Sequence, residues 1–151
     1  MPDDLHILLD REELREVRAR FAWTLDTRNW ASFASLFTDD VDVDLSAVGV
    51  PAARLTREEV VALFRHSFRR PITEMGTQQL YGNMVVELDG DSATVRSYLL
   101  GHHHVAGMEG GEDVELRAAY TDRLVRTSVG WRITAMTLHV LSLTGNAAIL
   151  A

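Results

Sequence analysis

Hydrophobic residues in the first quarter of the chain recur at helical spacing. Asp10 and Glu13 have the spacing of a capping box, and the apolar residues between Glu13 and Asp26 share one helical face. This pattern predicts an amphipathic helix that begins at Asp10 and ends near Asp26. Asn29 can cap a second, shorter helix over residues 30–37.

The hydrophobic period then changes to two, and later returns to the helical value. Apolar and polar residues alternate over 41–46, which predicts a strand with one buried face. Thr56 and Glu59 form a second capping box, and the apolar positions that follow predict a third helix that ends before Pro71.

After Pro71 the pattern is that of long strands. Turn residues such as Asp89-Gly90-Asp91 separate four strand-like runs, at residues 77–88, 93–105, 114–127 and 131–143. Helices gathered early and strands gathered late indicate an α+β fold, with an antiparallel sheet that curls around the helices. Since no repeat or linker divides the chain, we expect one domain over residues 1–151.

Composition narrows the classes of function. The 151 residues include no Cys, which excludes thiol catalysis, iron–sulfur ligation and a disulfide framework. The net charge of −7 argues against a nucleic-acid partner, because such proteins need a basic surface. No apolar run approaches the roughly 20 residues of a membrane span, and the N-terminus lacks a basic signal-peptide start. We therefore expect a cytoplasmic protein with no membrane partner.

Five segments in order resemble the SnoaL-like branch of the NTF2-like superfamily. They are residues 21–41, Asn83, residues 89–95, residues 120–127 and residues 130–133. The resemblance implies a cone-shaped α+β barrel, in which a curved antiparallel sheet is wrapped by three helices and opens into an apolar pocket. Members include scytalone dehydratase, polyketide cyclases, ketosteroid isomerase-like and limonene epoxide hydrolase-like enzymes, and the small subunit of ring-hydroxylating dioxygenases. It also implies a homodimer formed through the sheet, and a reaction without a cofactor.

Asp26 is the first candidate catalytic residue. Its segment is similar to the scytalone dehydratase stretch in which a Tyr-Asp pair faces the pocket, and burial there would raise the pKa of the carboxyl group. The alternative is a structural role, in which Asp26 caps the helix or pairs with Arg28. The dehydratase branch also requires two pocket histidines, and here Gln79 and Leu99 stand in their places. Gln79 cannot shuttle protons, but its amide can orient a carbonyl group or water.

Alternation along the strands identifies His103 as a candidate base in place of the missing histidine pair. If Gln79 faces the pocket, Tyr81 and Asn83 do so too, and on the next run Leu99 shares its face with His103. His102 and His104 then point to the opposite face, unless a β-bulge exchanges the two sets. No third ligand is spaced for a metal, apart from a speculative role for His139, so we expect no metal site.

The run after residue 113 offers two further polar candidates, Tyr120 and Asp122, on one face. Tyr120 can donate its phenolic hydrogen to a developing enolate, and Asp122 can act as a base or hold a His or Arg in place. The structural alternative pairs Asp122 with Arg117 or Arg132. Trp23 is expected in the core or the cavity wall, where it would contact substrate.

These residues favour a cofactor-independent acid–base enzyme that acts on a small, apolar, oxygenated molecule. Cyclisation or isomerisation of a polyketide-like intermediate fits best, because the dehydratase histidine pair is missing. Dehydration or epoxide opening on the same fold remains open, as does a non-catalytic ligand-binding or accessory subunit. The expected catalytic set is Asp26, His103, Tyr120 and Asp122, and the expected substrate contacts are Gln79, Tyr81, Asn83, Leu99 and Trp23.

Overall fold

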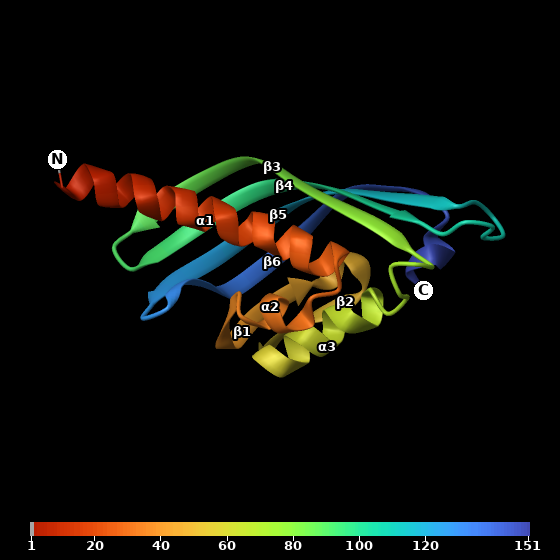
Figure 1. Cartoon of the computed structure of the whole chain (residues 1–151), viewed down its shortest axis with the longest axis horizontal. Coiled ribbons are helices and arrows are strands. Elements are labelled where there is room, and N and C mark those ends of the chain that lie inside the picture. Colours follow the sequence, from red (N-terminus) through yellow and green to blue (C-terminus); the bar gives the residue numbers. More distant parts are fainter. Residues whose placement is uncertain (1) are drawn as a thin grey trace.

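Three α-helices lie beneath an arched sheet of six strands in a computed structural model that describes residues 2–151 (Figure 1). The helices are α1 (Pro2–Asp26), α2 (Trp30–Ala34) and α3 (Arg57–Ser67), and two 3₁₀ helices are η1 (Ser46–Val48) and η2 (Ala147–Leu150). The strands are β1 (Phe37–Leu45), β2 (Val50–Thr56), β3 (Gly76–Asp89), β4 (Ser92–His104), β5 (Asp113–Thr127) and β6 (Gly130–Gly145). Among the described residues, no helix is long and apolar enough to cross a membrane.

The strands follow the order β2-β1-β6-β5-β4-β3. Neighbours pair antiparallel except β1 and β6, which run parallel, so the sheet is mixed rather than wholly antiparallel. The α+β class is confirmed. Strand β2 was not predicted, because most of its side chains are exposed and its sequence shows no alternation of apolar and polar residues.

The core lies between the helices and the inner face of the sheet. Phe21 of α1 is fully buried and meets Phe33 and Phe64 edge to face, with ring centroids 5.0 and 5.4 Å apart. Edge-to-face contacts bring the positive ring edge against the negative ring face. The aromatic cluster therefore joins all three helices.

Two of the three predicted helix starts are confirmed. The Asn29 side chain accepts a hydrogen bond from the Ser32 amide, and Thr56 forms a complete capping box with Glu59. The predicted start of α1 at Asp10 is wrong, because the helix already runs from Pro2.

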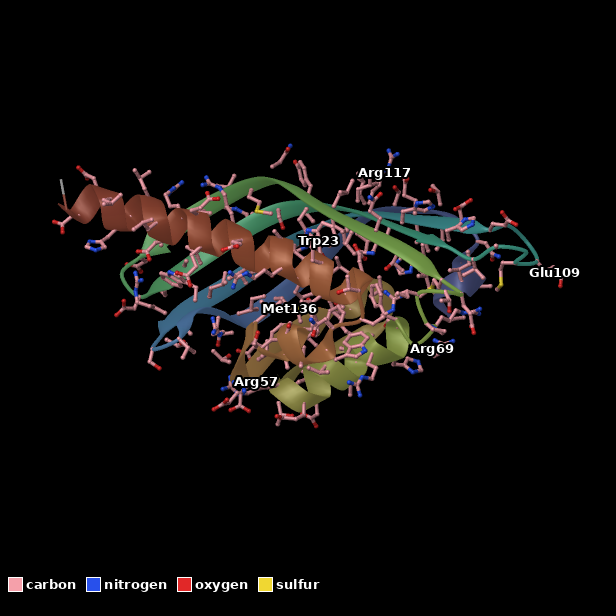
Figure 2. The ribbon with its side chains drawn as sticks, viewed as in Figure 1. Trp23, Arg57, Arg69, Glu109, Arg117 and Met136 are labelled. Atoms are coloured by element: carbon pink, nitrogen blue, oxygen red, sulfur yellow. The ribbon has the colours of Figure 1, made fainter. Side chains whose placement is uncertain are left out.

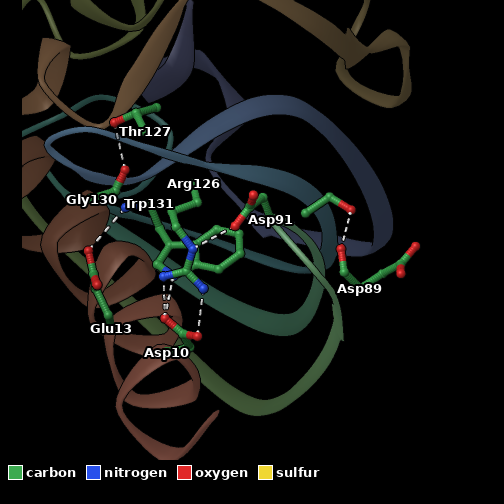
Figure 3. A network of polar contacts seen from close by, with 9 residues as sticks. Asp10, Glu13, Asp89, Asp91, Arg126, Thr127, Gly130 and Trp131 are labelled. Atoms are coloured by element: carbon green, nitrogen blue, oxygen red, sulfur yellow. Dashed lines mark hydrogen bonds and ion pairs between the residues drawn. The ribbon is translucent and has the colours of Figure 1, made fainter. Parts of the chain in front are cut away.

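Asp10 instead ties α1 to the β5–β6 hairpin. Its carboxylate accepts hydrogen bonds from the Arg126 guanidinium, at 2.7 Å each, and from the Trp131 indole at 3.1 Å (Figure 3). Glu13 accepts from the Trp131 backbone amide, and Asp91 binds the Arg126 guanidinium. The two acidic residues that resembled a capping box thus make tertiary contacts about two and three turns into a longer helix.

Candidate active site

A cavity of about 480 Å³ opens between α3, the inner face of the sheet and the two 3₁₀ helices. Its wall is mostly aliphatic and aromatic, with a few uncharged polar groups. The polar and titratable side chains that line it are Ser67, Gln79, Tyr81, His103 and Tyr120. An apolar pocket with a few convergent polar groups is the usual form of a small-molecule site.

His103 and Gln79 form the polar centre of this cavity. Both side chains are 8% exposed, and Gln79 Nε2 lies 3.3 Å from His103 Nε2. The other ring nitrogen, Nδ1, is buried and has no hydrogen-bond partner within residues 2–151. Gly101 makes room for the pair, since a Cβ there would lie 2.8 Å from Gln79 Oε1.

The imidazole of His103 is uncharged at neutral pH. Burial, followed by the nearby charges of Arg28 and His102, lowers the pKa of His103 from 6.5 to about 4. A neutral imidazole has one nitrogen that donates and one that accepts, and Gln79 can satisfy either role by turning its amide over. His103 is therefore available to accept a proton.

The lowered pKa of His103 predicts a pH-dependent stability. Between pH 6.5 and about 4 the unfolded chain binds more protons at this residue than the folded chain, so stability falls as the pH falls. We expect this residue to account for a loss of about 3 kcal/mol across that range. Urea unfolding at pH 7 and pH 4.5 measures it, with His103→Gln losing less and the exposed His66→Gln behaving like the wild type. Equal losses in all three proteins would contradict the buried, neutral imidazole.

Asp26 lies behind the cavity wall and does not line it. Its carboxylate accepts hydrogen bonds from the Thr77 hydroxyl at 2.8 Å and the Gln79 amide at 3.0 Å, and partial burial raises its pKa. Arg28, at a left-handed φ of 56°, donates to the Leu25 carbonyl and the Thr77 hydroxyl. The Asp26 carboxylate thus holds the backbone from which Gln79 projects.

Tyr120, Tyr81 and Leu99 line the cavity as their strand positions predict. Burial raises the pKa of Tyr120 to about 12, so its phenol stays protonated and can donate a hydrogen bond. The register of β4 with β5 is unbroken from Ser92 to His104, so alternation along β4 places Leu99 and His103 on one face.

Asp122 is fully buried beneath the cavity and pairs with a residue that was not singled out from the sequence. Arg18 Nε lies 2.8 Å from Asp122 Oδ2, and Arg18 Nη2 lies 2.5 Å from Asp122 Oδ1. The two partners considered from sequence are wrong, because Arg117 pairs with Glu115 and Arg132 bonds backbone carbonyls. The overlooked pattern was an arginine at a core position of α1, four residues after Leu14.

Two of the residues expected to contact substrate do not line the cavity. Trp23 is 72% exposed on the outer side of α1 and does not line the cavity (Figure 2). Asn83 has a φ of 51° at an irregularity between Gly82 and Val85, which breaks the alternation of β3. It lines a groove on the outer face of the sheet instead.

The remaining histidines lie away from the cavity. His102 and His104 point to the opposite face of β4, where both imidazoles contact Asp113 Oδ1, at 2.8 and 2.7 Å. His66 and His139 are exposed. In the described part of the chain, no group of three or more His, Cys, Asp or Glu residues is arranged to hold a metal ion.

Comparison with known proteins assigns the chain to a family. The SnoaL-like domain pattern matches residues 6–137. This chain belongs to the SnoaL-like domain family. The match covers most of α1 and most of the sheet, including Gln79 and His103, which form the polar centre of the cavity. A search of curated proteins found no match.

Solved structures similar to this SnoaL-like domain share its fold over nearly the whole chain. The Kfla4162 protein from Kribbella flavida is 25% identical, with a TM-score of 0.85, over 95% of this chain and 98% of that chain. An NTF2-like protein with a cystatin-like fold from Novosphingobium aromaticivorans is 27% identical, with a TM-score of 0.79, over 98% and 91%. Hexachlorocyclohexane dehydrochlorinase LinA-type3 from Novosphingobium barchaimii is 18% identical, with a TM-score of 0.79, over 98% and 97%.

Proposed function

We propose that this protein is an acid–base enzyme that works without a cofactor on a small, apolar, oxygen-bearing molecule. The observation that carries the proposal is the neutral His103 imidazole, whose Nδ1 is buried and unpaired in the described chain beside an otherwise apolar cavity. A buried nitrogen without a partner is costly to stability, which favours a role with a bound ligand.

In the proposed reaction, His103 removes a proton from carbon or from a hydroxyl group. The structure places Gln79 Nε2 beside His103 Nε2, so the proposed base requires the Gln79 amide to be turned over, with Oε1 accepting the Nε2 proton of His103. Nδ1 then carries the free lone pair and serves as the base once the substrate reaches this buried nitrogen. Tyr120 donates a hydrogen bond to the oxygen on which negative charge develops. Asp26 and Asp122 position these groups through Gln79 and Arg18 without touching the substrate.

Within this class we favour cyclisation or isomerisation of a polyketide-like intermediate. Both reactions move a proton without needing a leaving group, and the cavity has a single histidine rather than a pair. Elimination is the second candidate, because a dehydrochlorinase shares the fold and an elimination also begins with removal of a proton. A non-catalytic ligand-binding or accessory subunit is the third.

Proton exchange tests the proposal without knowledge of the substrate. A panel of apolar cyclic ketones and diketones is incubated with the protein in D₂O, and deuterium incorporation next to the carbonyl group is followed by NMR. The proposal predicts exchange of at least one panel member well above the buffer rate. Binding of panel members without exchange would favour a ligand-binding subunit.

We also propose that the outer face of the sheet forms a homodimer interface. An apolar groove of about 760 Å³ lies there, and Leu141, Tyr98 and Leu80 beside it are 82%, 63% and 52% exposed. Large exposed apolar patches mark interaction sites. Leu141→Glu is expected to convert a dimer into a monomer in light scattering, whereas Val129→Glu in a hairpin turn leaves it unchanged. A monomeric wild type would contradict this interface.

A further inference from the structure

The buried ion pair of Arg18 and Asp122 lies directly behind one wall of the cavity. Each residue is 1% exposed, and neither lines the cavity. The guanidinium also faces three aromatic rings, with Arg18 Cζ 4.1 Å from the Tyr120 centroid, 4.8 Å from Tyr81 and 4.2 Å from Phe21. Two of these rings, Tyr120 and Tyr81, are themselves cavity wall.

The two charges of the pair are unequally placed relative to the cavity. The guanidinium stacks on the tyrosine rings, whereas the Asp122 carboxylate, two residues beyond Tyr120 on the same face of β5, bonds to the guanidinium and does not line the cavity. Buried charges act through a low dielectric, so this asymmetry leaves a positive potential at the tyrosine wall. Of the other charged residues nearby, Asp26 and Arg28 lie beside Thr77 on β3, the strand that also carries Tyr81, and the Asp26 carboxylate acts against Arg18 by raising the pKa of Tyr81. His103 is neutral.

We propose that Arg18, which Asp122 holds in place, is a positioning residue for a ligand in the cavity. Its positive charge lies against the rings of Tyr81 and Tyr120 and favours the ionised form of a weak oxygen acid bound on their other side. A phenol or an enol belongs to this ligand class. The inference rests on the proposed function and deepens it, because it assigns the oxygen of the ligand to the tyrosine wall. The reacting proton is then left beside His103, farther along the neighbouring strand β4.

A chromophoric oxygen acid tests this directly. 4-Nitrophenol absorbs visible light only when ionised, so the ratio of ionised to neutral bound ligand is measured by absorbance at one pH with saturating protein. The Arg18→Met variant is expected to lower this ratio about tenfold, and Asp122→Asn, which leaves the guanidinium unopposed, is expected to raise it. A purely structural role for the pair would not move the ratio in opposite directions.

Three further variants secure the result. Arg18→Lys keeps the charge and is expected to restore most of the wild-type ratio, and Arg20→Met on the exposed side of α1 is the matched control. If Arg18→Met fails to fold because Asp122 is left unpaired, Arg18→Met with Asp122→Leu removes both charges and is expected to lower the ratio by a smaller amount. An unchanged ratio in the folded Arg18→Met variant, or in the folded double variant, would overturn the inference. Bound nitrophenol with an unchanged ratio leaves the proposed function standing, whereas failure of ketone exchange would count against that function alone.

Discussion

Replacing His103 with glutamine is expected to slow deuterium exchange into a bound ketone by about 100-fold to 10,000-fold, the usual contribution of a general base. Glutamine matches the size and polarity of the imidazole and can still bond to Gln79, so the cavity keeps its shape. It has no titratable nitrogen, so the lone pair that takes the proton is lost. NMR rates in D₂O, at saturating ketone, measure the effect.

His139→Gln and His66→Gln are the matched controls for this variant, because both histidines are exposed and neither lines the cavity. Their exchange rates are expected to equal that of the wild type. A His103→Gln protein that binds the ketone and exchanges it at the wild-type rate would remove His103 from the mechanism.

Truncating Phe21 to alanine is expected to lower the free energy of unfolding by about 3–5 kcal/mol. Its ring is fully buried and contacts Phe33, Phe37 and Phe64, so the variant leaves a void where the helices meet the sheet. The loss of the ring also removes one of the three faces that enclose Arg18. Urea unfolding at pH 7 measures the change.

Trp23→Ala is the control, on the same helix and with a larger side chain removed. Because Trp23 is 72% exposed, we expect a change within about 0.5 kcal/mol, the range of ordinary surface substitutions. A large loss at Trp23 together with a small loss at Phe21 would mean that α1 packs with a different face toward the sheet.

The fold was predictable because its elements carry regular patterns. Alternation along β4 correctly placed His103 inside and His102 outside, since no bulge interrupts its register with β5. The same argument failed two strand positions past Tyr81, where the irregularity at Asn83 turns the side chain to the outer face. A bulge depends on contacts between strands, and period-two reasoning within one strand cannot detect it.

The polar residues that line the candidate site were predictable from the sequence. The buried ion pair behind that lining was not. Gln79, His103 and Tyr120 follow from strand faces and family resemblance. The partner of Asp122 did not follow, because Arg18 lies 104 residues away and a salt bridge between α1 and β5 leaves no local pattern. Its one trace in the sequence was a charged residue within the apolar stripe of a helix.

A crystal structure of the protein soaked with an apolar ketone or phenol tests the central claim most directly. The account predicts ligand density in the cavity of about 480 Å³, with the ligand oxygen toward Tyr120 and a carbon or hydroxyl group within hydrogen-bonding reach of His103. Ligand found in the groove on the outer face of the sheet, with the inner cavity empty, would contradict it.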